Sequence, residues 1–501
     1  MKRSRMGIFL LGCFLLGACA KEEQILVDIF YTADVQGFYY SRPEPRFENR
    51  TAGGYGILQS FLARQENPYL LFDGGNWYGS APEANLTQGA YVADFMKVLP
   101  YTAASVSGPD FAYGWPVLRG LLRELKYPFI VSNLRLDNQI PWPLHDYQIF
   151  TRNGIKIGVF GLVGPEIFQK QKTRLAGLSV EDPIQTATDM VALLQNKGVD
   201  VIILLNALGE DTSNTPAEAL LAGEVGGIHL ILSANKDREM AETDTINNTF
   251  IVYPGAKLDS LSHIRLEFDK AKQIKNITFE DVPLLQDQWE EDEVLARRAA
   301  HLRQETQRKL NARVTRTESG VSTALNQESV LGDLLADCLY KWSRLDGAVL
   351  NSDSIRSSLP KGVVTEYDLY QMYPYGDNIT FLTMRGSAFL KALEASLEAK
   401  DNFPQIAGFD VTYNPQAPAG HKIKQIHFLK KNKMFHPQDT YRIAVTDHVL
   451  AGGFGHDYFV DSLEFKNTFV NARQIMRACL IRQKHVALPR PGRWTVAHDA
   501  D

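Results

Sequence analysis

The sequence has 501 residues, of which 45% are hydrophobic and 22% are charged, with 37 Gly, 23 Pro and 4 Cys. These proportions are typical of a folded protein and exclude a collagen, a disulfide-rich miniprotein and a multispan membrane protein. The formal net charge of −5 disfavours nucleic acid as a partner. At roughly 150 residues per domain, the length predicts about three units or two larger α/β domains.

The first residues are typical of a lipoprotein signal. Three basic residues precede an apolar run over residues 6–16, which is shorter than the roughly 20 residues of a membrane-spanning helix. Leu16-Gly17-Ala18 then leads to Cys19, a pattern that resembles a bacterial lipobox. We predict that residues 1–19 are a signal peptide, and that Cys19 carries the lipid that anchors the protein to a membrane of the bacterial cell envelope. An uncleaved anchor and a cut at a nearby site are the alternatives.

Short apolar runs follow in chain order, bounded by Gly, Asp and Asn and separated by helix-length segments. This pattern predicts buried strands of a layered α/β domain over residues 25–283. The runs cover residues 25–31, 69–72, 129–132, 155–162, 199–205 and 228–232. In such domains, functional groups lie on loops just beyond the carboxyl ends of the strands.

The segment from residue 284 to about 316 contains no Gly or Pro and is rich in Glu, Arg, Gln and Ala. This composition predicts one long exposed connector helix. A second mixed α/β unit is expected over residues 317–491, followed by a tail over 492–501. Its patterns predict helices at 329–343 and 387–397 and strands at 348–350, 379–384 and 441–445. Beyond Cys19, only Cys338 and Cys479 remain, which permits one disulfide, although the apolar surroundings of Cys338 favour a buried packing residue.

Ten loop segments in order resemble those of the extracytoplasmic 5′-nucleotidase and UDP-sugar hydrolase family. In the first unit the segments are TADVQG at 32–37, LFDGGN at 71–76, SGPDFAYG at 107–114, LNALG at 205–209 and SANKD at 233–237. In the second unit they are ESVLGDL at 328–334, NSDSIR at 351–356, YPYGD at 373–377, FPQIAG at 403–408 and AGGFGH at 451–456. The resemblance implies a four-layer αββα metallophosphoesterase-like domain, a connector helix and a mixed α/β 5′-nucleotidase C-terminal domain.

Most catalytic residues of that family are replaced here. The family holds two divalent metals with Asp, Asn and His side chains and one bridging Asp, and an auxiliary His-Asp pair stabilises the transferring phosphoryl group. Aligned with its metal ligands are Asp34, which is kept, and Gln36, Asn76, Gly108, Ala207, Asn235 and Asp237, which are replacements. The auxiliary pair falls on Pro109 and Ala112, neither of which can donate a proton. The resemblance therefore implies a catalytically silent first domain.

An oxygen-only metal site is the alternative for this domain. Asp34, Gln36, Asn76, Asp110, Asn235 and Asp237 offer carboxylate and amide oxygens, which suit one hard divalent cation, Mg²⁺ or Ca²⁺, better than zinc. The same residue types are also common as turn and cap residues. The sequence leaves both interpretations open.

In the second unit, the resemblance implies a nucleotide-recognition site, in which aromatic rings stack on the base. The aligned positions are Asn351, Ser354, Arg356, Phe403 and His456, with Phe454 or Tyr458 as an alternative second ring. Asp353 adds a negative charge where phosphate oxygens would approach, which favours an uncharged nucleoside or sugar. Phe403 as a core residue and Arg356 in a structural salt bridge are the alternatives.

Three functions are thus expected from the sequence. The first is an envelope lipoprotein that binds a nucleoside, a nucleotide or a protein partner without hydrolysis. The second is a divergent metal-dependent nucleotide phosphohydrolase with the oxygen-only site. The third is a scaffold that presents exposed aromatic side chains, for which the candidates are Tyr39, Tyr40, Trp77, Tyr78 and Trp115.

Overall fold

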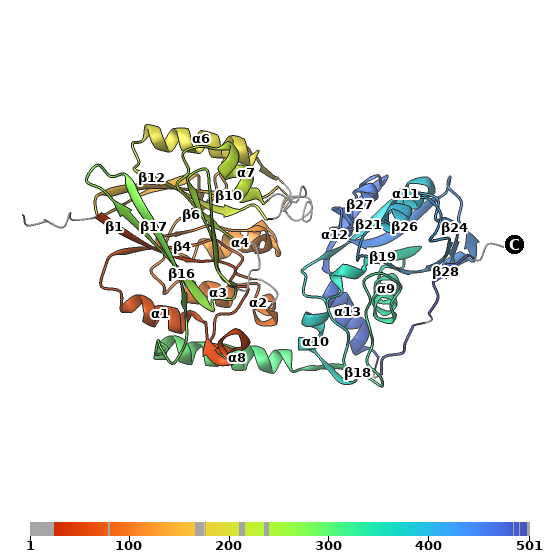
Figure 1. Ribbon diagram of the computed structural model, residues 1–501. Coiled ribbons are helices and arrows are strands. Elements are labelled where there is room, and N and C mark those ends of the chain that lie inside the picture. The colour runs from red at the N-terminus through yellow and green to blue at the C-terminus, as the bar shows by residue number, and fades with distance from the viewer. Residues whose placement is uncertain are drawn as a thin grey trace, which may run out of the picture.

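The structure is a computed structural model that describes residues 25–78, 81–165, 175, 177–209, 216–234, 240–483, 485–489 and 491–497. Cys19, Asn235 and Asp237 lie outside the described residues. Two domains lie side by side, and one helix runs along the first domain towards the second (Figure 1). Within the described part of the chain, no helix has the length and hydropathy needed to cross a membrane.

The first domain contains two facing sheets. The first is ordered β17 (Ile274–Pro283), β16 (Ser260–Phe268), β1 (Ile25–Thr32), β4 (Tyr69–Asp73), β5 (Ala103–Ala104), β6 (Phe129–Ile130) and β8 (Leu144–His145). The second is ordered β14 (Glu242–Ile246), β15 (Thr249–Tyr253), β13 (Leu230–Ser233), β12 (Val201–Ala207), β10 (Ile155–Val163) and β9 (Tyr147–Arg152). Apolar side chains of β1, β4, β10, β12 and β13 form one fully buried core cluster, so both sheets contribute to the central layer of the domain.

Helices cover the outer faces of both sheets. Around the first sheet lie α1 (Tyr55–Ala63), α2 (Pro82–Thr87), α3 (Ala90–Met96) and α4 (Trp115–Leu122), and against the second lie α6 (Pro183–Asn196) and α7 (Ala217–Glu224). Two short antiparallel strand pairs complete the domain: β2 (Arg42–Glu44) with β3 (Arg50–Ala52), and β7 (Leu134–Leu136) with β11 (Leu178–Val180). Two single 3-10 turns are η1 (Pro45–Phe47) and η2 (Gly108–Phe111). The predicted αββα layers and their six strands are confirmed.

The connector differs in extent from the sequence expectation. Helix α8 spans Glu293–Leu310 and begins where the Asp292 carboxylate accepts hydrogen bonds from the backbone N–H groups of Val294 and Leu295, as an N-cap does. The segment 284–292 is not helical. One stripe of α8, which includes Leu295, Ala299 and Leu302, joins the core of the first domain, so the helix is half-buried rather than exposed.

The second domain is built on a mixed sheet ordered β22 (Pro404–Ala407), β19 (Gly347–Asn351), β26 (Thr440–Thr446), β21 (Asn378–Arg385) and β27 (Glu464–Asn471). Its helices are α9 (Val330–Ser343), α10 (Glu366–Met372), α11 (Gly386–Ser396), α12 (Asp447–Leu450) and α13 (Ala472–Ile481), with η3 (Ser352–Ser354), η4 (Leu429–Lys431) and η5 (Tyr458–Val460). A second sheet is ordered β25 (Lys433–Met434), β24 (Ile423–Phe428), β23 (Phe409–Tyr413) and β28 (Trp494–Val496), and β18 (Arg313–Thr317) pairs with β20 (Gly362–Thr365).

Two expectations for the second domain change. Cys338 and Cys479 form a disulfide with a Cα–Cα distance of 5.6 Å that joins α9 to α13, so Cys338 is more than a packing residue. Residues 494–496 form strand β28, which pairs in parallel with β23, so this part of the expected tail belongs to the domain. The helices and strands predicted at 329–343, 387–397, 348–350, 379–384 and 441–445 are confirmed within one or two residues.

Candidate functional site

The loops after β1 and β4 form the centre of the candidate metal cleft. Asp34 and Asn76 follow the carboxyl ends of these adjacent parallel strands, and both side chains are buried. The Asn76 Nδ2 donates a 2.7 Å hydrogen bond to Asp34 Oδ1. Backbone bonds lock the two loops together, since the N–H of Asp34 donates to Gly75 O and that of Gln36 to Asn76 O, each at 3.0 Å. The structure thus brings Asp34, Gln36 and Asn76 together, as the strand pattern predicts.

This hydrogen bond opposes the binding of a shared cation. Carboxylates that hold a metal pair present oxygen atoms to it, whereas here an amide N–H of Asn76 points at the Asp34 carboxylate. The amide orientation is fixed because the opposite flip would set Asn76 Oδ1 against Asp34 Oδ1. Asn76 Oδ1 itself is buried and has no hydrogen-bond partner. Among the described residues, no group of three His, Cys, Asp or Glu side chains could hold a metal ion, so the described part of this cleft does not fit the metal pair of the family.

Asp110 supports the loops through hydrogen bonds to both of its carboxylate oxygens. Its Oδ2 accepts hydrogen bonds from the backbone N–H groups of Asn76 (2.7 Å) and Ser107 (2.8 Å), and its Oδ1 accepts one from Trp77 (2.7 Å). Ser107 and Asp110 form a capping box at η2, which satisfies the N–H groups of that turn. Burial raises the pKa of Asp110 to about 6, against the opposing effect of these N–H donors. Its two oxygens are therefore used in structural bonds.

A second buried carboxylate, Asp73, lies beneath the same loops. It accepts hydrogen bonds from Thr32 Oγ1 (2.7 Å), from the Gly75 N–H (2.8 Å) and from Trp77 Nε1 (2.8 Å). Burial raises its pKa to about 7. Gly75 has φ +95°, and a Cβ there would lie 2.7 Å from the Ser107 nitrogen, so only glycine fits this close approach. The LFDGGN segment is thus explained by packing and loop geometry.

The carboxyl ends of β12 and β13 hold polar groups that the sequence did not single out. Asn206 Nδ2 donates a 2.8 Å hydrogen bond to Glu218 Oε1, and Ser233 Oγ donates to the same oxygen. Glu218 lies on α7 and is fully buried. Ala207, at the position of a family His, has no exposed surface and belongs to the apolar core. Asn235 and Asp237 lie outside the described residues and are not placed.

In the second domain, the strand register gathers the predicted recognition residues. Asn351 pairs with Pro404 across β19 and β22, which brings Asn351 next to Phe403. Asn402, which sequence reasoning missed, accepts a hydrogen bond from the Asp353 N–H (3.2 Å) and donates one to Gly453 O (2.6 Å). It therefore joins the 351–356 loop to the 451–456 loop. Its place directly before the aligned Phe403 is the signal that could have found it.

The polar side chains of this cluster bind one another. Asn351 Nδ2 donates to Ser354 Oγ (2.8 Å) and to Asp353 Oδ1. Arg356 is exposed, and its Nη1 donates to the backbone oxygen of Asp353 at 3.3 Å. Asn351 Oδ1 remains buried without a partner. The N–H groups of the Asn351 amide are therefore used within the loop.

The two expected stacking rings are held by other aromatic side chains. Phe403 is partly buried and contacts Trp494 edge-on at 5.1 Å. His456 stacks near Tyr458 (5.1 Å) and Phe459 (6.0 Å), and its Nε2 shares a 3.1 Å hydrogen bond with Ser396 Oγ. Burial lowers the pKa of His456, so the neutral ring is favoured. Phe403 thus packs against a core cluster, and His456 is half-buried beside aromatic side chains.

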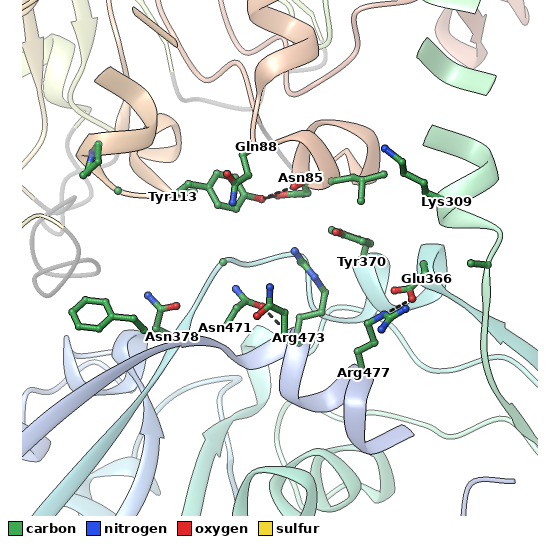
Figure 2. A pocket seen from close by; sticks show the side chains of 18 residues that line it. Asn85, Gln88, Tyr113, Lys309, Glu366, Tyr370, Asn378, Asn471, Arg473 and Arg477 are labelled. Carbon is green, nitrogen blue, oxygen red and sulfur yellow. Dashed lines mark hydrogen bonds and ion pairs between the residues drawn. The ribbon is translucent and has the colours of Figure 1, made fainter. Parts of the chain in front are cut away.

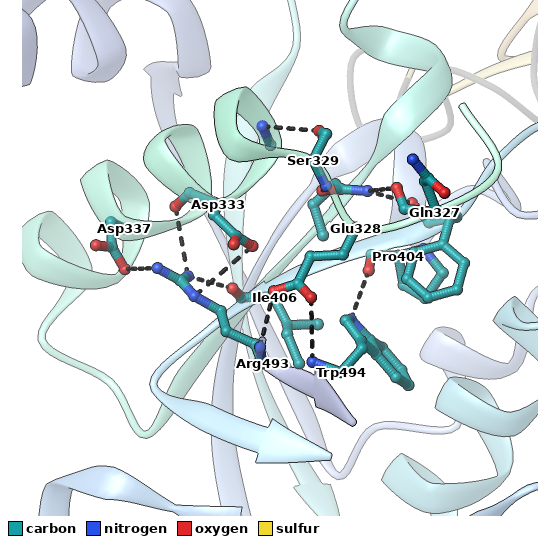
Figure 3. Close-up of polar contacts among 12 residues, drawn as sticks. Gln327, Glu328, Ser329, Asp333, Asp337, Pro404, Ile406, Arg493 and Trp494 are labelled. Carbon is teal, nitrogen blue, oxygen red and sulfur yellow. Dashed lines mark hydrogen bonds and ion pairs between the residues drawn. The ribbon is translucent and has the colours of Figure 1, made fainter. Parts of the chain in front are cut away.

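A clasp at the start of β28 contacts Phe403 through the ring of Trp494, and Figure 3 shows its polar contacts. Both Glu328 oxygens accept backbone hydrogen bonds, from Arg493 (2.8 Å) and Trp494 (3.4 Å). Trp494 Nε1 donates to Pro404 O at 3.0 Å. Arg493 reaches Asp337 Oδ1 at 2.9 Å and Asp333 Oδ1 at 3.6 Å. Glu328 of the ESVLGDL segment thus has a structural role.

A cavity of about 1020 Å³ lies between the two domains (Figure 2). On the side of the first domain it is lined by α2, the loop of residues 112–116 and the end of α8, including Asn85, Gln88, Tyr113 and Lys309. On the other side it is lined by α10, β27 and α13, including Glu366, Tyr370, Asn378, Asn471, Arg473 and Arg477. The predicted auxiliary position Ala112 faces this cavity, whereas Asp34 and Phe403 are not among its lining residues.

The comparisons with known proteins agree with this architecture. Residues 309–461 match the family model described as 5′-nucleotidase, C-terminal domain. The chain is 25% identical over 79% of its length to the trifunctional nucleotide phosphoesterase protein of Bacillus subtilis, of which it spans 30%, and 22% identical over 85% of its length to the 5′-nucleotidase of Vibrio vulnificus, of which it spans 86%. The chain thus contains a segment that matches the C-terminal domain of 5′-nucleotidases, and it is similar to 5′-nucleotidases over most of its length.

Two solved structures share the whole fold. A 5′-nucleotidase precursor of Thermus thermophilus is 19% identical with a TM-score of 0.70, and the match covers 95% of this chain and 100% of that one. A protein of Staphylococcus aureus described as a 5′-nucleotidase, solved in complex with alpha-ketoglutarate, is 19% identical with a TM-score of 0.75 and coverage of 94% and 99%. The expected two-domain fold is confirmed.

Proposed function

We propose that this protein is a 5′-nucleotidase-family protein that binds a small ligand and does not hydrolyse phosphate esters. The observation that carries the proposal is the Asn76–Asp34 hydrogen bond of 2.7 Å. It replaces the carboxylate pair that would share a cation with an internal amide–carboxylate contact. The buried carboxylate Asp110 supports the proposal as well, since N–H donors bind both of its oxygens.

We further propose that the protein is anchored in the bacterial cell envelope through a lipid on Cys19. The signal-like sequence of residues 1–19 supports this assignment. The disulfide between Cys338 and Cys479 also supports a place outside the cytoplasm, because disulfides persist mainly in oxidising surroundings. A mass measurement of the amino-terminal peptide tests the anchor separately from ligand binding, since an acylated Cys19 is expected at the start of the mature chain.

The scaffold function loses its stated basis in the structure. Tyr39, Trp77 and Tyr78 have at most 1% of their surface exposed and Trp115 has 7%, so the prediction that they are exposed was wrong. Trp77 instead donates its ring N–H to Asp73, and Tyr39 stacks on Phe95 with ring centroids 5.1 Å apart. The divergent hydrolase with a hard cation remains the competing function, because Asn76 Oδ1 is a buried oxygen without a partner.

A phosphate-release assay tests the proposal. A soluble form that lacks the signal peptide and the lipidated cysteine, residues 20–501, is incubated with AMP, ADP or UDP-glucose and with Mn²⁺, Zn²⁺, Co²⁺, Mg²⁺ or Ca²⁺ in turn. We expect the same rate of release as from the Asp34→Ala variant, because neither protein binds the metal pair. Metal-dependent release by the native chain that is lost in Asp34→Ala would support the hydrolase instead.

A further inference from the structure

We propose that the cavity between the domains binds the phosphate or carboxylate group of an anionic ligand, held mainly by Arg473, Arg477 and Lys309. The inference rests on the proposed ligand-binding function and assigns the ligand to a different place from the aligned Phe403 and His456. The cavity volume of about 1020 Å³ is sufficient for a small organic ligand, for which pockets of about 300–1,000 Å³ are usual.

Arg473 gives the strongest indication of an anion. It is 9% exposed, and its Nη1 donates to the backbone oxygens of Tyr373 (2.8 Å) and Tyr375 (3.5 Å). Its guanidinium carbon lies 3.8 Å from the centroid of the Tyr370 ring. Among the described residues, no carboxylate lies within ion-pair distance of Arg473, although buried charges are usually paired. An anion in the cavity would supply the missing negative charge.

Two more cations face the same space from different elements (Figure 2). Arg477 lies one turn beyond Arg473 on α13 and pairs with Glu366. Lys309 lies in the last turn of α8 and pairs with Glu305 at 2.9 Å. Glu366 is the sole carboxylate among the described lining residues. The lining is therefore positive overall, although the whole chain has a formal charge of −5.

Neutral donors complete the lining. Asn471 caps α13 and accepts a hydrogen bond from the Gln474 N–H at 3.3 Å, so the amino end of this helix opens on the cavity with the positive end of its dipole. Asn85, Gln88, Asn378 and Gln474 add side-chain amides from both domains. Arg and amide side chains in this arrangement suit the oxygen atoms of phosphate and carboxylate groups.

The aligned base site is a poorer place for such a ligand. Its Asn351 amide donates to Asp353 and Ser354, and the ring of Phe403 contacts Trp494. Asp353 also adds a negative charge there. An anion that lies in the interdomain cavity would be attracted both to Lys309 of the connector helix and to Arg477 of the second domain, and it would therefore stabilise the domain arrangement of Figure 1.

Isothermal calorimetry on the full mature chain tests this inference with inorganic phosphate, AMP and succinate as probes, which distinguish a phosphate ligand from a dicarboxylate. We expect at least one probe to bind, and the Lys309→Gln/Arg477→Gln double variant to bind it about 100-fold more weakly, since hydrogen bonds to charged groups contribute about 1.5–3 kcal/mol each. Both side chains are about half exposed, so the double variant should fold.

Three control variants sharpen the result. Glu366→Gln should tighten binding, because it removes the carboxylate from the lining. Lys341→Gln, a helical lysine paired like Lys309 with a carboxylate one turn away, should leave it unchanged, and Phe403→Ala should have little effect. Failure of all three probes to bind, equal affinity in the double variant, or loss of binding in Phe403→Ala alone would overturn the inference. None of these results depends on phosphate release, which tests the proposed function separately.

Discussion

The Cys338→Ala/Cys479→Ala double variant is expected to lower the free energy of unfolding of the second domain by roughly 4–5 kcal/mol. The disulfide closes a loop with a sequence separation of 141 residues, and loops of this length gain about that much from reduced entropy of the unfolded chain. The bridge also holds α13, which carries Arg473 and Arg477, against α9. Urea unfolding followed by circular dichroism measures the change.

Two controls accompany this measurement. The single variant Cys338→Ala should lose as much stability as the double variant, since either substitution removes the bond. Native protein treated with a reductant should approach the same value. A loss below about 1 kcal/mol, the ordinary size of a single-site effect, would show that the link between α9 and α13 contributes little.

Arg493→Met is expected to destabilise the second domain by about 3 kcal/mol at alkaline pH, the usual cost of breaking a buried ion pair from one side. Arg493 is 9% exposed and holds Asp337 and Asp333, and its Nη1 also donates to Ile406 O. Methionine keeps most of the side-chain volume but leaves these acceptors unpaired. Chemical denaturation of both proteins gives the difference, and Arg482→Met, in an exposed position at the end of α13, serves as the matched control.

The loss should depend on pH with a defined sign. Burial raises the pKa of Asp333 to about 8, and Arg493 opposes this rise. A carboxyl whose pKa is higher in the folded state binds more protons there, so stability falls as the pH rises from about 4 towards 8. Without Arg493 the pKa rises further, so the difference between the variant and the native protein should be larger at pH 9 than at pH 6. A difference that is constant or shrinks with pH would contradict the assignment to Asp333.

The strands of the first domain could be predicted because their sequences are buried on both faces. The run from Ile25 to Tyr31 reads as one apolar strand and forms most of β1. The start of the connector helix was harder to predict. Residues 284–292 lack Gly and Pro, yet they are not helical, and α8 begins only after its N-cap residue Asp292. Helix propensity alone does not locate such a cap, and the amphipathic stripe of α8 is what packs it on the first domain.

The candidate site likewise has a part that the sequence predicts and a part that it does not. The loops after parallel strands could be brought together from the strand pattern, and Asp34 and Asn76 do meet. The structural role of Asp110 could not be foreseen, since it depends on N–H groups from two loops. The exposure of the aromatic side chains was predicted wrongly. Trp77 donates a hydrogen bond to the buried Asp73, and Tyr39 stacks on Phe95, so both rings lie inside the domain. The clasp joins Arg493 to Glu328 across 165 positions of sequence, a separation that no local pattern reports.

The central claim of the proposed function is that the cleft of the first domain does not hold a pair of divalent metals, and metal stoichiometry tests this claim most directly. Calorimetric titration of the mature chain with Mn²⁺, with elemental analysis after desalting, is expected to find no tightly held ion in the first domain. Asn76→Asp should raise Mn²⁺ affinity, because it replaces the N–H donor to Asp34 by a second carboxylate. Two tightly bound ions per native chain, both lost in Asp34→Ala, would contradict the account.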